Sequence, residues 1–109
     1  YKMILTVEGE MNEQQMVIDY YDLEKIINPL VQELDHAFMV NKNDKMVLEF
    51  LDQINSKKVV VDFDATVENI CLFIIDKIKN AGLPKNIKAV SVRIYETRFD
   101  FAEERIELN

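Results

Sequence analysis

The sequence predicts an α+β domain in which an antiparallel sheet carries two long helices on one face. Three observations lead to this prediction: strand-like alternation of side chains near both ends of the chain, two helical periodicities between them, and 49% hydrophobic residues with only two glycines and two prolines. Strands at the ends with helices between them build a sheet that the helices cover on one side. A length of 109 residues fits one domain, residues 1–109.

The first expected elements are a strand and a helix. Residues 1–8 alternate with the period of a half-buried strand, and their apolar face consists of Tyr1, Met3, Leu5 and Val7. A polar turn follows at 10–15, and 16–20 is extended and leads to Asp22, the expected N-cap of the first helix.

The first helix is expected over 23–34, where apolar residues recur at helical spacing. Pro29 interrupts this pattern, and an interior proline removes a backbone hydrogen bond at a cost of about 3 kcal/mol or more. We therefore expect a kink near Pro29, or a helix that begins later than its periodicity suggests. Beyond it, 41–44 has the composition of a loop, 47–54 suggests a short helix and 58–63 is rich in strand-forming residues.

The second long helix is expected to begin at Thr66 as N-cap and to end before Gly82 and Pro84. Its apolar face includes Cys71, which we interpret as a core residue, and is widened by Leu72, Phe73 and Ile75. Two strands follow, at 88–96 and 99–108. The first places Val90, Val92 and Ile94 inward and Ser91, Arg93 and Tyr95 outward, so that by parity Glu96 shares the apolar face.

Composition excludes several classes of function. The net charge is −7, which repels phosphate backbones and argues against nucleic acid as a partner. The one cysteine cannot form an internal disulfide, which favours a reducing, cytoplasmic compartment. The longest apolar run, 70–75, is far too short to span a bilayer, so we expect no membrane partner. Neither a metal-ligand set nor a glycine-rich phosphate loop can be read in the chain.

The one histidine, His36, follows Asp35 at the expected end of the first helix. Histidine titrates near neutrality and a carboxylate can orient its ring, so the pair is a candidate for proton transfer. The alternative is that His36 merely caps the last carbonyls of the helix, where a cation is favoured. Adjacency in sequence does not decide between these readings.

Three further residues are candidates for substrate binding. Glu96 would present a carboxylate at the end of an apolar strand face, where it could bind the ring N–H and amine of a heterocycle with both oxygens. Its alternative role is an ion pair with Arg93 or Arg98. Thr66 and Glu68 open the second helix, so their ordinary role is capping and dipole compensation.

Four segments of the chain, in this order and spacing, resemble the 6-pyruvoyl-tetrahydropterin synthase and 6-carboxytetrahydropterin synthase family. They are Met16-Val17-Ile18-Asp19-Tyr20-Tyr21-Asp22-Leu23, Glu33-Leu34-Asp35-His36, Ala65-Thr66-Val67-Glu68-Asn69-Ile70 and Val92-Arg93-Ile94-Tyr95-Glu96-Thr97. The resemblance covers nearly the whole chain. It implies the tunnelling fold, with a four-stranded antiparallel sheet whose first strand is missing here, and a homo-hexamer formed as a dimer of trimers with active sites between subunits.

The resemblance also implies roles for the candidate residues. Asp35 and His36 would belong to a catalytic relay that includes a cysteine, and Glu96, with Thr66 and Glu68, would anchor the pterin. The family binds Zn through three histidines, which this chain lacks together with the relay cysteine. We expect the zinc ligands in an N-terminal segment that would precede Tyr1, and we expect this chain by itself to be inactive. Gln15 and Arg98 stand where the family usually has glycine and proline.

The expected function is a zinc-dependent carbon–oxygen lyase that acts on 7,8-dihydroneopterin triphosphate. We favour 6-carboxytetrahydropterin synthase, an enzyme of queuosine biosynthesis, because of the long segment from Asn41 to Phe63. The alternatives are 6-pyruvoyl-tetrahydropterin synthase, which eliminates triphosphate, and a non-catalytic tunnelling-fold module that binds a pterin or purine.

Overall fold

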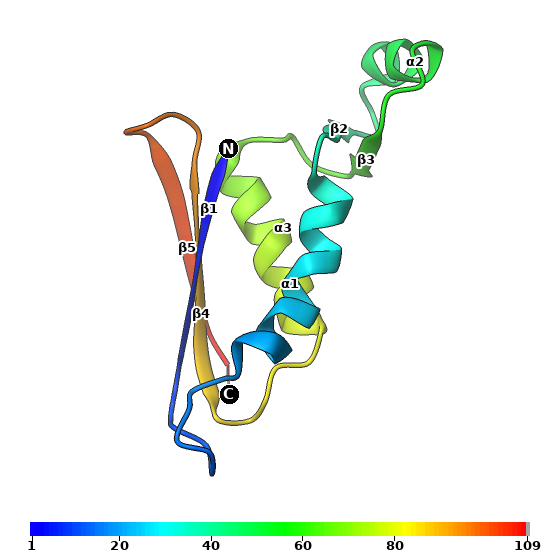
Figure 1. The fold of residues 1–109 in the computed structure, drawn as a ribbon. Coiled ribbons are helices and arrows are strands. Elements are labelled where there is room, and N and C mark those ends of the chain that lie inside the picture. Colours follow the sequence, from blue (N-terminus) through cyan, green and yellow to red (C-terminus); the bar gives the residue numbers. More distant parts are fainter. Residues whose placement is uncertain (109) are drawn as a thin grey trace.

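The computed structural model describes residues 1–108, so that Asn109, the last residue of the expected domain, lies outside it. Figure 1 shows eight elements. In chain order they are β1 (Lys2–Gly9), α1 (Tyr20–Leu34), β2 (Phe38–Asn41), α2 (Lys45–Gln53), β3 (Lys58–Val61), α3 (Val67–Asn80), β4 (Ile87–Tyr95) and β5 (Phe101–Glu107).

The main sheet has three strands in the order β1-β4-β5, and both pairs are antiparallel. At one end of the sheet Tyr95 stands between Lys2 on β1 and Phe101 on β5. The register slips at the other end, between Glu8 and Gly9. Each of these strands lies within or close to a segment that the sequence predicts to be a strand.

The two long helices lie on the same face of this sheet (Figure 1). Helix α3 packs against β4 and β5, and α1 packs against α3. The core between these layers contains Leu30 from α1, Cys71 and Ile78 from α3, and Val90 and Val92 from β4. The predicted α+β architecture, with both helices on one side of an antiparallel sheet, is confirmed.

Helix α1 begins earlier than predicted, and its N-cap is Asp19 rather than Asp22. A carboxylate oxygen of Asp19 accepts a hydrogen bond from the Tyr21 N–H at 2.8 Å, which satisfies a donor that the helix itself leaves free. The expectation of a late start is therefore wrong. Pro29 lies inside the helix at an exposed position. Its missing N–H leaves the carbonyl of Lys25 for solvent, because Lys25 is exposed too.

Strand β2 is not predicted from the sequence; it pairs in parallel with β3, and helix α2 forms the crossover between them. Together β2, α2 and β3 form a lobe that projects from the sheet and long helices (Figure 1). Strand β2 has four residues, too few for a clear alternation, and its partner lies 20 residues further along the chain. The short helix and the strand-prone segment that follows it were predicted correctly.

Two residues differ in burial from the expectation. Ser91 points away from the helices but is buried, because Arg105 of β5 reaches across the central strand to Glu8 of β1, with Nε 2.9 Å from a carboxylate oxygen. This hydrogen bond from the Arg105 guanidinium lowers the pKa of the Glu8 carboxyl. Leu72 was expected to widen the apolar face of α3, yet 48% of its surface is exposed, since it lies on the flank of the helix away from the sheet.

Cys71 is fully buried against the sheet, as predicted, and burial raises the pKa of its thiol. The folded state therefore keeps this proton at a pH where the unfolded chain releases it. We expect the free energy of unfolding to fall with rising pH above about pH 8.5, where an ordinary thiol ionises. Urea unfolding at several pH values should show a shallower decline for Cys71→Ala than for the wild type. Equal slopes would contradict this prediction.

No helix within residues 1–108 is long and apolar enough to cross a membrane.

Candidate functional site

The start of β1, the end of β4 and the start of α3 lie at one end of the sheet (Figure 1). One contact fixes the alignment of α3 with the strands: the Cys71 thiol lies 3.5 Å from the carbonyl oxygen of Ala102, which pairs with Ile94. Glu68 precedes Cys71 by one helical turn, and Glu96 follows Ile94 by two residues. Helix α3 runs in the direction opposite to β4. Glu68 and Glu96 therefore both lie on the same side of the Cys71–Ala102 contact, toward the same end of the sheet.

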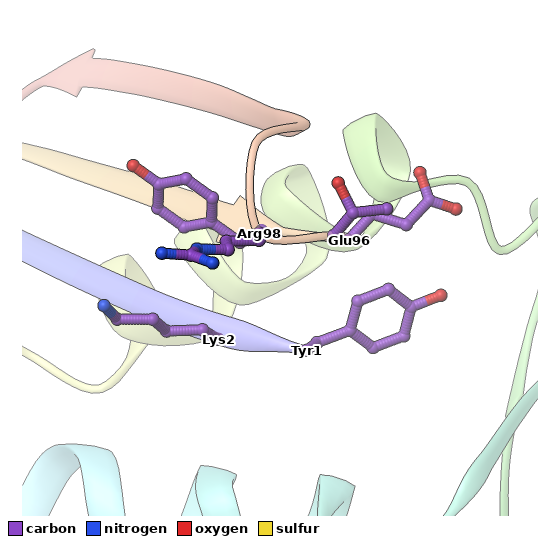
Figure 2. Close-up of a pocket in the computed structure, with 6 residues that line it drawn as sticks. Tyr1, Lys2, Glu96 and Arg98 are labelled. Atoms are coloured by element: carbon purple, nitrogen blue, oxygen red, sulfur yellow. The ribbon is translucent and has the colours of Figure 1, made fainter.

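A cavity of about 470 Å³ opens at this end of the sheet. It is lined by Tyr1, Lys2, Tyr95, Glu96, Thr97 and Arg98. Figure 2 shows the Glu96 carboxylate and the Tyr1 ring on one side, and the Lys2 amine and Arg98 guanidinium on the other. The cavity therefore offers an acceptor pair at one side and positive charge at the other.

The turn that carries Glu96 is held by hydrogen bonds. The Glu96 N–H donates to the carbonyl of Asp100 at 2.9 Å, which closes the turn between β4 and β5. The Thr97 hydroxyl lies 2.7 Å from an Asp100 carboxylate oxygen and accepts the N–H groups of Phe99 and Asp100. The backbone beneath the Glu96 carboxylate is thus fixed. In the sequence Thr97 stands out only as part of a motif, and no local pattern indicates this role.

Glu96 is exposed, which corrects the expectation that it shares the buried apolar face. Strand β4 ends at Tyr95, so Glu96 lies just beyond the region that α3 covers. The alternative ion pair with Arg93 or Arg98 does not form among residues 1–108. Arg93 instead pairs with Glu103, whose carboxylate lies 3.3 Å from Nε, and Arg98 stacks over Phe99. The Glu96 carboxylate is therefore available to a ligand.

Thr66 caps α3 as expected, since its hydroxyl oxygen accepts the Asn69 N–H at 3.2 Å. A hydroxyl that accepts one hydrogen bond still has a proton to donate, so capping leaves Thr66 able to bind a ligand. Glu68 lies in the first turn of α3, where a negative charge is favourable for the helix dipole. The structural roles proposed for both residues are satisfied, and both lie at the cavity end of α3.

Asp35 and His36 follow α1 at its C-terminal end. Asp35 is the C-cap, and His36 has a left-handed backbone with φ 56°. His36 Nδ1 lies 3.0 Å from a carboxylate oxygen of Asp35, and both side chains are largely exposed. The helix carbonyls of Gln32 and Asp35 accept hydrogen bonds from the amine of Lys57, not from His36. This geometry does not support the alternative role of His36 as a helix cap.

The structure does not bring all the predicted site residues together. Glu96 follows β4, and Thr66 and Glu68 lie at the start of α3, whereas Asp35 and His36 lie between α1 and β2. No hydrogen bond or ion pair joins the two groups within the described part of the chain. One copy of the chain therefore presents two separate halves of the predicted site.

A zinc site does not fit the residues that the structure describes. Zinc requires three or four ligands from histidine, cysteine or carboxylate side chains. His36 is the one histidine, Cys71 is buried in the core, and no cluster of three such side chains occurs among residues 1–108.

The family can be decided by comparison with known proteins. A family model described as 6-pyruvoyl tetrahydropterin synthase matches residues 1–107. The chain belongs to this family. The resemblance found in four sequence segments is thereby confirmed.

The names of the relatives that match this chain are consistent with this family. The chain is 32% identical to 6-carboxy-5,6,7,8-tetrahydropterin synthase of Aquifex aeolicus, over 98% of this chain and 72% of the relative. It is 30% identical to the protein of the same name from Haemophilus influenzae, over 94% of this chain and 77% of the relative. Among solved structures, 6-pyruvoyl tetrahydropterin synthase from Plasmodium vivax superimposes with a TM-score of 0.75 at 17% identity, over 97% of this chain and 78% of that one. That likeness confirms the tunnelling fold.

Proposed function

We propose that this protein is a 6-carboxytetrahydropterin synthase, a cytoplasmic lyase of queuosine biosynthesis that acts on 7,8-dihydroneopterin triphosphate. The observation that carries the proposal is the Glu96 carboxylate, which lies unpaired in the cavity at the end of β4 on a backbone fixed by hydrogen bonds. A pterin has a ring N–H beside an exocyclic amine. Two carboxylate oxygens match this donor edge and fix the orientation of the ring as well as binding it.

The other candidate residues have supporting roles. Thr66 and Glu68 lie at the same end of the fold and help to hold the pterin. Lys2 and Arg98 place positive charge beside the cavity, which suits a substrate with a triphosphate tail. Asp35 and His36 place an imidazole nitrogen 3.0 Å from a carboxylate oxygen, and we assign this pair to proton transfer.

Assembly into a homo-hexamer, a dimer of trimers, is part of the proposal. Within one copy Asp35 and His36 do not contact the cavity that contains Glu96. An active site between subunits would let His36 of one copy exchange protons with a pterin bound at Glu96 of another. Zinc is the cofactor that the family suggests, but residues 1–108 offer no ligand set for it, and no step proposed here runs through a metal.

The product distinguishes the two enzymes of this family, because carboxy and pyruvoyl side chains differ in mass. Full-length protein incubated with 7,8-dihydroneopterin triphosphate should yield the carboxy product by mass spectrometry. We favour this product because the relatives from Aquifex aeolicus and Haemophilus influenzae carry that name. A pyruvoyl product would instead identify the protein as a 6-pyruvoyl-tetrahydropterin synthase. Absence of turnover would refute both synthase activities.

The second candidate is a non-catalytic module that binds a pterin or purine through Glu96. The lack of a metal-ligand set among residues 1–108 favours this alternative. A protein of this kind would bind the substrate in calorimetry without converting it, and it would contain no stoichiometric zinc by elemental analysis.

A further inference from the structure

Lys57 holds the segment that carries His36 from both sides. Its amine donates hydrogen bonds to the carbonyl oxygens of Gln32 and Asp35, the latter at 2.8 Å. Its own carbonyl oxygen accepts the Phe38 N–H at 3.0 Å. The side chain and main chain of one residue thus bind the backbone immediately before and after the turn that contains His36.

This arrangement is more specific than ordinary helix capping. The last turn of α1 contains no basic residue of its own, so the cation at its C-terminus comes from Lys57, 22 residues beyond Asp35. Lys57 immediately precedes β3, and the β2–β3 pairing begins beside it with Phe38 opposite Lys58. The hydrogen bonds of Lys57 therefore join the lobe to the C-terminal end of α1, next to Asp35 and His36.

Local interactions alone would not fix the conformation of the segment that contains Asp35 and His36. His36 adopts φ 56°, which few non-glycine residues occupy, and its side chain is 90% exposed, so no packing fixes the ring. Among residues 1–108 the one polar contact of the ring is that of Nδ1, which lies 3.0 Å from an Asp35 carboxylate oxygen. Anything that moves the Asp35 backbone moves this carboxylate and with it the imidazole.

We propose that Lys57 is a positioning residue that holds the Asp35 backbone so that the Asp35 carboxylate keeps His36 in the Nδ1–H tautomer. This proposal rests on the proposed function of the pair. In that tautomer the lone pair is on Nε2, on the side of the ring opposite Asp35, where it can accept a proton from a substrate. Without Lys57 the ring can rotate and exchange tautomers, and the base is presented for only part of the time.

The test uses the fact that His36 is the one histidine of the chain, so its imidazole nitrogens give a single set of NMR signals. Nitrogen-15 spectra at about pH 9, where a histidine ring is ordinarily neutral, report the ratio of tautomers. Lys57→Met keeps the aliphatic stem and removes the donor, whereas Lys57→Arg keeps a cation that can reach both carbonyls. Lys58→Met is the matched control, because the neighbouring Lys58 pairs with Asp52 inside the lobe and does not contact α1.

We expect Lys57→Met to shift His36 toward the Nε2–H tautomer and to lower kcat on the order of 10-fold with KM unchanged. Lys57→Arg should restore both values, and Lys58→Met should leave both unchanged. A wild-type tautomer ratio in Lys57→Met, or an equal shift in Lys58→Met, would overturn the proposal. If Lys57→Met fails to fold, Lys57→Gln replaces it. The NMR measurement does not depend on turnover, so it tests the role of Lys57 separately from the proposed function. If His36→Ala keeps its turnover, the proposed function is refuted, but the tautomer ratio still shows whether Lys57 positions the ring.

Discussion

Glu96→Gln is expected to weaken pterin binding about 100-fold, roughly 2.7 kcal/mol, while leaving the fold intact. Glutamine replaces one carboxylate oxygen with an amide NH2 group, so a donor faces the donor edge of the pterin and the charge that strengthened both hydrogen bonds is lost. The exposed position of Glu96 and the absence of an ion pair for it among residues 1–108 mean that the substitution leaves no internal partner stranded. Isothermal titration calorimetry with the substrate measures the change in Kd.

The matched control for this prediction is Glu107→Gln. Glu107 lies on the same sheet, is 78% exposed at the far end of β5, and contacts Arg105 rather than the cavity. The same loss of one negative charge there should change Kd by less than about two-fold, because exposed charges at that distance are largely screened. Wild-type affinity in Glu96→Gln would refute the assignment of Glu96 as the ring anchor.

His36→Ala is expected to abolish most turnover while preserving substrate binding. Removal of a general acid–base group typically lowers kcat by about 10²- to 10⁴-fold. In the proposed assembly His36 exchanges a proton with the substrate, whereas Glu96 holds the pterin ring, so the Kd of the substrate should stay within about two-fold of the wild type. Steady-state kinetics and calorimetry on the same preparation separate the two effects.

The variant His36→Asn separates the loss of the imidazole from any change in backbone conformation at this position. His36 has φ 56°, a conformation that asparagine tolerates better than alanine. His36→Asn should therefore unfold at the same temperature as the wild type and still lack turnover. If either variant turns over substrate at the wild-type rate, His36 is an ordinary helix-end residue.

Local patterns were enough to predict the elements of the main fold. Alternation of side chains located β1 and β4, because one face of each strand packs against the helices and the other does not. Strand β5 was expected from the mixture of apolar and charged residues in its segment. Helical spacing and the Thr66 cap located α3 in the same way. The start of α1 was placed wrongly because Asp19 and Asp22 are equally good caps from composition, and the Asp19–Tyr21 hydrogen bond decided between them.

The sequence by itself determined the α+β class, the family and the residue types of the candidate site, since each depends on local periodicity or on short motifs. Only the tertiary structure decided where those residues lie. It placed Glu96 in an exposed cavity just beyond Tyr95, the last residue of β4. It also joined Lys57 to Asp35 across 22 residues and separated His36 from Glu96 within one copy. Contacts between residues so far apart in the chain depend on the packing of whole elements, which no local pattern encodes.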